Sequence, residues 1–279
     1  MKTIILFILL VSATFAQSPL LTLFDGGFEP ETITYRTRVI ADGGEVSDIV
    51  GLDNFIKLLK ANNAYTNCKI LADPNWGVKK NINNKVTKLY DVFGNDLVRS
   101  DTAEAPSLIS YVNNDAGATS FNILRFDGTN DYLIDASMTL AQPSTVFFGV
   151  RPLRWTGGNV YFSSYTWASV YVSQNNIANA LRIDGTTFWN NIENTAIVNE
   201  FACLRFVLNG ANSKIQYNVV AESTGDIGTG DLGGFCFGAG SFPFFFSNIE
   251  TGTIAVFNST LNATQTLNIQ NFLISRWSL

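Results

Sequence analysis

Short apolar runs separated by clusters of Gly, Asn and Asp fill the chain from residue 85 to residue 257, and this spacing constrains the fold more than any other feature. Runs of this length between turn residues are typical of β-strands. We expect strands at residues 85–91, 107–112, 121–126, 144–150, 160–162, 168–173, 180–184, 201–208, 214–219, 234–238 and 251–257. Many short strands in this order predict an antiparallel β-sandwich or jelly roll, and not a parallel sheet with crossover helices.

The stretch Leu124–Leu133 is expected to form the entry to this sandwich. Phe126 and Leu133 are apolar anchors on either side of a polar turn. Within that turn, Asp127-Gly128 is a pair of residues that favours tight hairpins. The stretch therefore predicts two strand edges joined as a β-hairpin.

Residues 1–16 combine a short basic start, an apolar middle and the small residues Thr14 and Ala16. This is the pattern of a secretory signal peptide, and it is too short for a comfortable membrane span. The alternative is a buried N-terminal arm that is never cleaved.

Residues 17–66 are expected to form a helical segment ahead of a sandwich that covers residues 67–279. Pro30 suits a first helical turn, Ile33, Val39 and Ile40 share one face of that helix, and Ser47 is a candidate N-cap for a second helix. The apolar stripe of this helical pair predicts a packing face, or alternatively a surface that docks onto a partner.

The end of the chain carries a third helical signal. Asn262 and Gln265 have the spacing of a capping box, and Ile269, Leu273 and Trp277 then share one helical face. We expect this helix to cover an edge or an open end of the sandwich.

Composition excludes several kinds of function. The formal net charge is −5 with no long basic run, which argues against a nucleic-acid partner. The chain has no His, which removes the commonest general base and the imidazole metal ligand. Its three cysteines, an odd number, give no disulfide framework. Cys203 and Cys236 are expected to be buried, a bridge between them being the alternative.

From about Cys68 to Leu279 the chain resembles the concanavalin A-like lectin/glucanase superfamily in its laminin-G/pentraxin-like form. The residues that carry the resemblance are Lys88–Asn95, Leu124–Leu133, Ser144–Pro152, Gly233–Gly240 and Gly252–Phe257, followed by the closing helix. The resemblance implies a two-sheet jelly roll whose concave face or end loops bind glycans. The stretch Glu29–Lys60 before it is similar to the N-terminal part of bacteriophage virion proteins.

A glucanase of this fold needs two carboxylates at even spacing on one strand, because strand side chains alternate between faces. The family pattern Glu-x-Asp-x-x-Glu does not occur in the sequence. Isolated glutamates stand at Glu193, Glu200, Glu222 and Glu250. We therefore predict no enzymatic activity, while a hydrolase with carboxylates brought together from distant strands stays open.

Laminin-G and pentraxin relatives often hold Ca²⁺ at a loop, so the resemblance makes Asp127, Asn130 and Asp131 candidate oxygen ligands. The alternative, which we favour, is that these side chains bond backbone amides of the turn. No cofactor is expected apart from such a Ca²⁺ ion.

Exposed aromatic rings beside amide side chains are the groups that bind sugars. The candidate carbohydrate-binding residues are Trp155, Asn159, Tyr161, Tyr165, Trp167, Trp189 and Asn190. For each aromatic residue the alternative is a place in the core. The apolar run Phe242–Phe246 is either a core strand or an exposed subunit contact.

Together these features predict a non-catalytic β-sandwich outside a cell, either as a virion fibre or decoration protein or as a secreted or cell-surface protein. Its expected partners are a glycan or cell-surface polysaccharide and further subunits, either identical copies or other structural proteins, without nucleic acid and without a membrane span in the mature form. The alternatives are a secreted lectin-like protein, a glycan-active hydrolase, and a structural component with no ligand.

Overall fold

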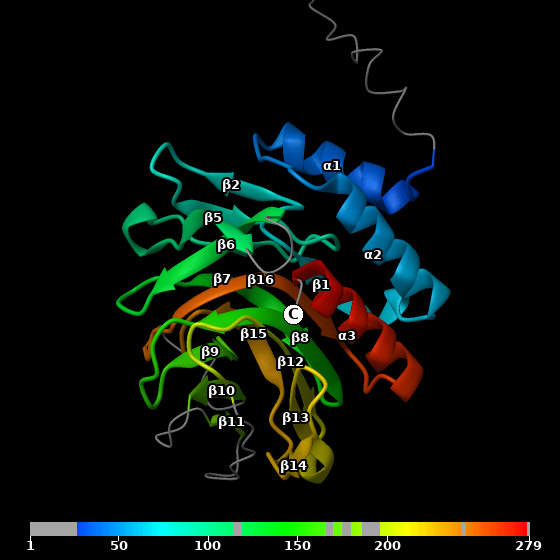
Figure 1. Cartoon of the computed structure of the whole chain (residues 1–279), viewed down its shortest axis with the longest axis vertical. Helices are drawn as coiled ribbons and strands as arrows, with labels where there is room; N and C mark the ends of the chain where they lie inside the picture. The colour runs from blue at the N-terminus through cyan, green and yellow to red at the C-terminus, as the bar shows by residue number, and fades with distance from the viewer. Residues whose placement is uncertain are drawn as a thin grey trace, which may run out of the picture.

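The computed structural model describes residues 27–113, 119–165, 170–174, 180–185, 196–240 and 244–277, and the predicted signal segment lies outside them. The described residues form two antiparallel sheets packed face to face, with three α-helices against one of them (Figure 1). The predicted mostly-β sandwich with N-terminal and C-terminal helices is therefore confirmed. No helix in the described ranges is long and apolar enough to cross a membrane.

The sheet next to the helices is called the central sheet here. Its strands run in the order β14-β13-β12-β8-β16-β6-β5, and β1 also pairs with β16. Their bounds are β1 (Cys68–Ala72), β5 (Ser107–Asn113), β6 (Thr119–Asp127), β8 (Ser144–Pro152), β12 (Ala202–Leu208), β13 (Ser213–Tyr217), β14 (Ser223–Gly225) and β16 (Asn248–Phe257).

The second sheet, called the outer sheet, has the order β11-β10-β9-β15-β7-β4-β3-β2. Its strands are β2 (Val78–Lys80), β3 (Val86–Leu89), β4 (Leu97–Val98), β7 (Leu133–Leu140), β9 (Val160–Ser163), β10 (Tyr171–Gln174), β11 (Leu181–Asp184) and β15 (Leu232–Phe237). Short 3₁₀ turns lie at Tyr65–Asn67, Thr102–Glu104 and Gly210–Asn212.

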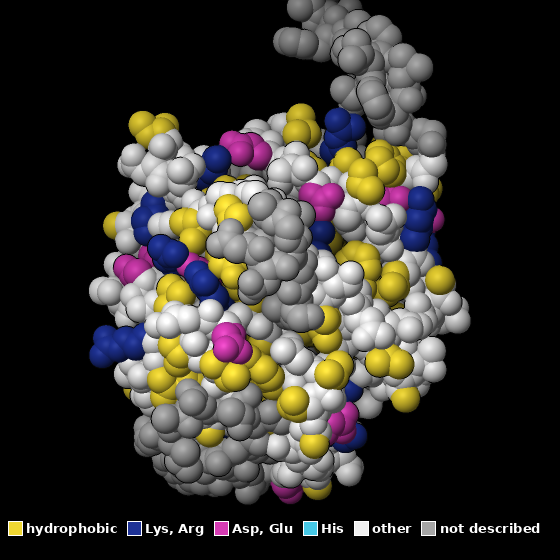
Figure 2. Space-filling model, viewed as in Figure 1, with side chains coloured by type: hydrophobic (Ala, Val, Ile, Leu, Met, Phe, Trp, Pro, Cys, Tyr) yellow, Lys and Arg dark blue, Asp and Glu magenta, His cyan; other side chains and the backbone are white. Residues whose placement is uncertain are grey.

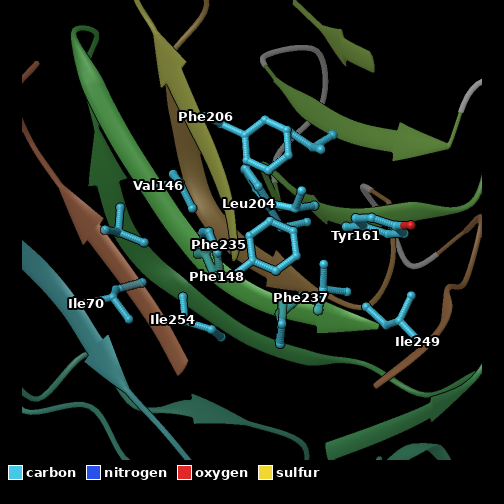
Figure 3. Packing of buried hydrophobic residues seen from close by; sticks show 14 of the residues in the cluster. Ile70, Val146, Phe148, Tyr161, Leu204, Phe206, Phe235, Phe237, Ile249 and Ile254 are labelled. Atoms are coloured by element: carbon cyan, nitrogen blue, oxygen red, sulfur yellow. The ribbon is translucent and has the colours of Figure 1, made fainter. Parts of the chain in front are cut away.

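The main core lies between the sheets and is built around Phe148 of β8. Its ring stacks on Phe206 at 5.6 Å between centroids and meets Tyr161 and Phe237 edge-on (Figure 3). Phe162 meets it edge-on as well. Offset and edge-to-face contacts of this kind stabilise a core beyond the area that they bury. The aromatic residues of the strands therefore fix how the two sheets face each other.

A second core lies between the central sheet and the helices α1 (Pro30–Ala41), α2 (Ile49–Ala61) and α3 (Ala263–Trp277). Because both faces of the central sheet are covered here, β8 and β12 read as nearly continuous apolar runs and not as alternating ones. The third helix thus covers a face of the sheet, and our expectation that it covers an edge or an open end was wrong. Its predicted capping box is confirmed, since the side chains of Asn262 and Gln265 each accept the other's backbone amide.

Two details of the helical pair differ from expectation. The N-cap of α2 is Asp48 and not Ser47, because the Asp48 carboxylate accepts the amide of Gly51 at 2.8 Å. Ile40 of α1 is exposed, whereas Tyr35 and Val39 are buried, so the helix is rotated from the expected apolar face.

The predicted hairpin at Leu124–Leu133 is wrong. β6 pairs with β5 and β16 in the central sheet, while β7 pairs with β15 and β4 in the outer sheet, so residues 128–132 cross from one layer to the other. Phe126 and Leu133 both point into the space between the sheets, and this shared burial outweighs hairpin pairing. Residues 141–143 return the chain to β8, so β7 is tied to the central sheet at both ends.

The cysteines are buried and free. Cys203 faces the helices from the central sheet, and Cys236 lies on the far side of the outer sheet with Tyr132 and Ala239. The two thiols point away from each other, which excludes the alternative of a bridge between them and confirms their prediction as buried side chains.

We expect truncation of Leu273 to show how much the docking of α3 stabilises the fold. Leu273 is fully buried against α2 and the central sheet, so Leu273→Ala should lower the free energy of unfolding by about 2–5 kcal/mol. The matched control is Leu267→Ala on the same helix, where the side chain is 53% exposed and the change should stay within about 0.5 kcal/mol. Urea denaturation followed by tryptophan fluorescence measures both, and equal losses would contradict this packing.

Candidate carbohydrate-binding site

Two segments meet at one end of the outer sheet. Residues 153–159 join β8 to β9, and residues 244–247 lead into β16. The amide of Val160 donates to the carbonyl of Phe245 at 2.9 Å, and the amide of Gly240 donates to the carbonyl of Phe244 at 2.7 Å. The hydroxyl of Ser247 also donates to the carbonyl of Val160. These bonds hold Phe244 and Phe245 beside the loop that contains Trp155.

Phe244 and Phe245 are 60% and 68% exposed. Phe245 has a φ of 60°, a left-handed backbone conformation that costs a non-glycine residue about 1–3 kcal/mol. Its ring lies against two glycines, because a Cβ added at Gly158 or Gly240 would come within 3.9 Å and 3.6 Å of it. A large apolar ring is thus kept on the surface by a strained backbone, whereas burial would be the default for such a side chain.

Gln174 of β10 orders the loop that contains Trp155 through hydrogen bonds of its side chain and backbone. Its buried side chain accepts the amide of Thr156 at 2.8 Å and donates to the carbonyl of Arg154 at 3.0 Å. Its backbone carbonyl accepts the amide of Gly158, and its backbone amide donates to the carbonyl of Asn159. The loop is therefore ordered before any ligand arrives.

The predicted carbohydrate-binding residues occupy different environments. Trp155 is half-buried against the main core, and Asn159 is half-buried beside it in the loop. Tyr161 is fully buried and its hydroxyl accepts a bond from Gln174, so it supports the loop from inside the core and cannot stack on a sugar. Burial raises the pKa of Tyr161 well above its usual value, against the bond from Gln174, which lowers it. Tyr165 packs with Tyr132 on the far side of the outer sheet.

Other predicted residues cannot be placed. Trp167, Trp189 and Asn190 lie outside the described residues, as do the first two residues of the Phe242–Phe246 run. Of the three described residues of that run, two are exposed and Phe246 packs near Tyr132, so the core-strand interpretation does not hold for them.

The candidate Ca²⁺ residues are engaged within their own turn. Asp127 accepts the amides of Thr129 and Asn130, Asp131 accepts the amide of Asp127, and Asn130 donates to the carbonyl of Ala103. Asp131 also contacts the ammonium of Lys85 at 3.4 Å. Burial, followed by the charge of Asp127, raises the pKa of Asp131. These bonds are the ones that the turn interpretation predicts, since both carboxylates accept backbone amides of the turn.

Two glutamates that the sequence left isolated are paired with bases. Glu250 lies between Arg125 and Arg151, and Glu222 contacts Arg205 and Lys214. Each of the two carboxylates is therefore held by two basic groups.

Sequence reasoning missed two parts of the site. The sequence shows Gln174 only as one polar residue in a strand, and nothing marks it as the residue that orders a neighbouring loop. The sequence also gives no sign of the strained backbone at Phe245, since left-handed positions usually carry Gly, Asn or Asp.

No protein-family model and no curated protein sequence matches the chain. Similar solved structures include domain 4 of an extracellular GH43 arabinanase from Geobacillus stearothermophilus in complex with arabinotriose, at 15% identity and a TM-score of 0.46, covering 60% of this chain and 81% of that one. Trypanosoma rangeli sialidase with 2,3-difluorosialic acid has 10% identity and a TM-score of 0.47, covering 82% and 40%. The receptor-binding domain of a botulinum neurotoxin C/D mosaic serotype has 10% identity and a TM-score of 0.48, covering 76% and 52%. At these values the likeness concerns the β-sandwich fold alone.

We expect Gln174→Ala to loosen the loop without unfolding the sandwich. The amide of Thr156 loses its acceptor, so its hydrogen exchange should quicken about 5- to 30-fold, as for a loss of about 1–2 kcal/mol. Gln216→Ala is the control, because the Gln216 side chain donates to the carbonyl of Val220 in a nearby turn, away from the Trp155 loop. Unchanged exchange at Thr156 in the first variant would contradict the role given to Gln174.

Proposed function

We propose that the chain is a non-catalytic, surface-displayed β-sandwich that binds carbohydrate at the site formed by Trp155, Thr156, Asn159, Phe244 and Phe245, called here the aromatic end. The observation that carries the proposal is the exposed pair of phenylalanines, one of them on a strained backbone, beside an ordered polar loop. Strain of this kind persists where the surrounding structure enforces it, and it concentrates at binding sites.

The chemistry of the aromatic end suits a sugar. The rings of Phe244 and Phe245 offer apolar faces for the CH groups of a pyranose, and the amide of Asn159 and the hydroxyl of Thr156 can bond its hydroxyls. Because Gln174 orders the loop in advance, little conformational entropy is lost when a ligand binds.

The setting of this activity is also a proposal. Display outside a cell, on a virion as a fibre or decoration protein or on a cell surface, is supported by the signal-like pattern of residues 1–16 and by the similarity of Glu29–Lys60 to virion proteins. Such a protein acts as an attachment module, alone or within an oligomer. A glycan-active hydrolase is the alternative.

Glycan-array binding tests the proposal. We expect Phe244→Ser and Phe245→Asn each to weaken binding about 5- to 10-fold, in line with about 1 kcal/mol for one aromatic contact. Asn is chosen at residue 245 because it tolerates the left-handed backbone. The control is Val219→Ser, which removes an apolar side chain of similar exposure from the turn after β13.

Three results would contradict the proposal. Unchanged glycan binding in both phenylalanine variants would show that Phe244 and Phe245 do not form the binding site. Release of reducing sugars by the wild type would favour the hydrolase. A shift in oligomeric state on Phe245→Asn, with glycan binding intact, would make these residues a subunit contact.

A further inference from the structure

The helix-side face of the central sheet carries an aromatic group beside α3. The last described turn of α3 brings Trp277 against Phe121 at 4.6 Å and Phe201 at 5.6 Å between ring centroids. On the same face Tyr111 packs on Phe121 and on Phe201. Figure 2 shows Lys and Arg side chains gathered over the region that β5 and β6 occupy in Figure 1.

A ladder of three charged residues lies on the same face. Glu250 of β16 stands opposite Arg125 of β6 on one side and Arg151 of β8 on the other. Nε of Arg125 donates to Oε1 of Glu250 at 2.8 Å, and Nε of Arg151 donates to Oε2 at 2.6 Å. The Nη2 group of each arginine contacts the same oxygen. Both oxygens of the fully buried carboxylate are therefore satisfied.

The ladder carries one positive charge more than this carboxylate neutralises. Arg125 is 47% exposed, while Arg151 is mostly buried, with its guanidinium 4.7 Å from the ring centre of Tyr111. Among the residues that the structure describes, neither Nη1 group makes a hydrogen bond. The carboxylate of Asp127, two residues further along β6, is turned to the amides of Thr129 and Asn130. The Nη1 groups of both arginines are thus not engaged by the buried acid, and that of Arg125 belongs to a half-exposed side chain.

A structural ion pair requires only one arginine for one glutamate. One arginine is enough to neutralise the charge of Glu250, so the second gives the ladder a net positive charge besides its bond to the carboxylate. Planar guanidinium groups bind carboxylate and sulfate oxygens with two parallel bonds, and such charge-assisted bonds are about twice as strong as neutral ones.

The ladder and the aromatic end are connected along the chain. Arg151 precedes Trp155 by four positions, and the amide of Leu153 donates to the carbonyl of Asn248, which ties that segment to the strand of Glu250. The strand that carries Arg151 thus leads into the loop of the aromatic end, where Trp155 packs against the core between the sheets, while the ladder itself lies on the helix-side face of the central sheet.

We propose that Arg125 and Arg151 form an oxyanion site for an acidic sugar, in which the carboxylate or sulfate of a glycan is bound by the free guanidinium edges. This inference rests on the proposed glycan binding and narrows the ligand class. A single excess charge suits one anionic substituent, whereas a nucleic acid needs a row of basic residues.

NMR titrations of the whole protein test this site, with the Nε–Hε signals of Arg125 and Arg151 as direct reporters. We expect sodium glucuronate or glucose 6-sulfate to shift both signals, while glucose at the same concentration and ionic strength does not. Arg125→Gln should weaken binding of the acidic sugar about 10-fold or more, equal to about 1.4 kcal/mol or more. Arg151 still neutralises Glu250 in that variant, so the fold should be kept.

Two further variants make the test sharp. Arg125→Lys keeps the charge but loses the planar fork, so its affinity should fall between those of the wild type and Arg125→Gln. Arg36→Gln removes one arginine charge from α1 and should bind as the wild type does.

Equal shifts with glucose and glucuronate would overturn the inference, as would equal affinities of the Arg125→Gln and Arg36→Gln variants, or shifts by inorganic sulfate alone. The two proposals fail separately. If neutral glycans bind in a way that depends on Phe245 and the arginine signals do not shift, the aromatic end is supported as a glycan site and the acidic-sugar site is contradicted. If the arginine signals shift equally in wild type and Phe245→Asn and no glycan binds on the array, the anion site is supported and glycan binding at the aromatic end is contradicted.

Discussion

The contact on which the layered arrangement depends is the buried bond between Asp73 and Arg276. Asp73 is fully buried, and its carboxylate accepts bonds from Arg276 of α3 at 3.1 Å and from the hydroxyl of Thr253 in β16 at 2.5 Å. Arg276 also donates to Asp48 at the start of α2. Burial lowers the pKa of Arg276, and the two aspartates raise it by more. A buried acid left without its base would be costly, so this contact requires both helices to lie where they cover the sheet.

That cover explains the rest of the architecture. Once the helices lie on the central sheet, its middle strands β8 and β12 are buried on both faces and consist mostly of apolar residues. Beside Trp277 the same face also carries the charged ladder of Arg125, Glu250 and Arg151. The helix-side face thus holds an apolar core together with two buried ion-pair groups, one at Asp73 and one at Glu250.

The strands and the capping box could be predicted from the sequence because their signals are local. Spacing of apolar residues marks β8 and β12, and two polar side chains three residues apart mark the start of α3. The role of Leu124–Leu133 could not be predicted, since hairpin and crossover use the same turn residues. Only the pairing partners far along the chain, near Ile249 and Phe237, decide between them.

The residues of the candidate site likewise differ in whether a local sequence signal marks them. Aromatic residues beside amides pointed to Trp155 and Asn159, whereas Gln174 acts across strands and left no local signal. The Arg–Glu–Arg ladder joins three strands at residues 125, 151 and 250. Residue spacing predicts contacts within one helix or strand, so it could not predict this group.

The attachment of β7 has a mechanical consequence. Because residues 128–132 and 141–143 lead directly from this strand to β6 and β8, a pull on either layer reaches the other through a short stretch of backbone at each end of β7. Sliding one sheet along the other would stretch one of these links before the core contacts part. A force that pulls the two sheets in opposite directions would therefore be opposed by two short backbone connections in addition to the contacts of the core.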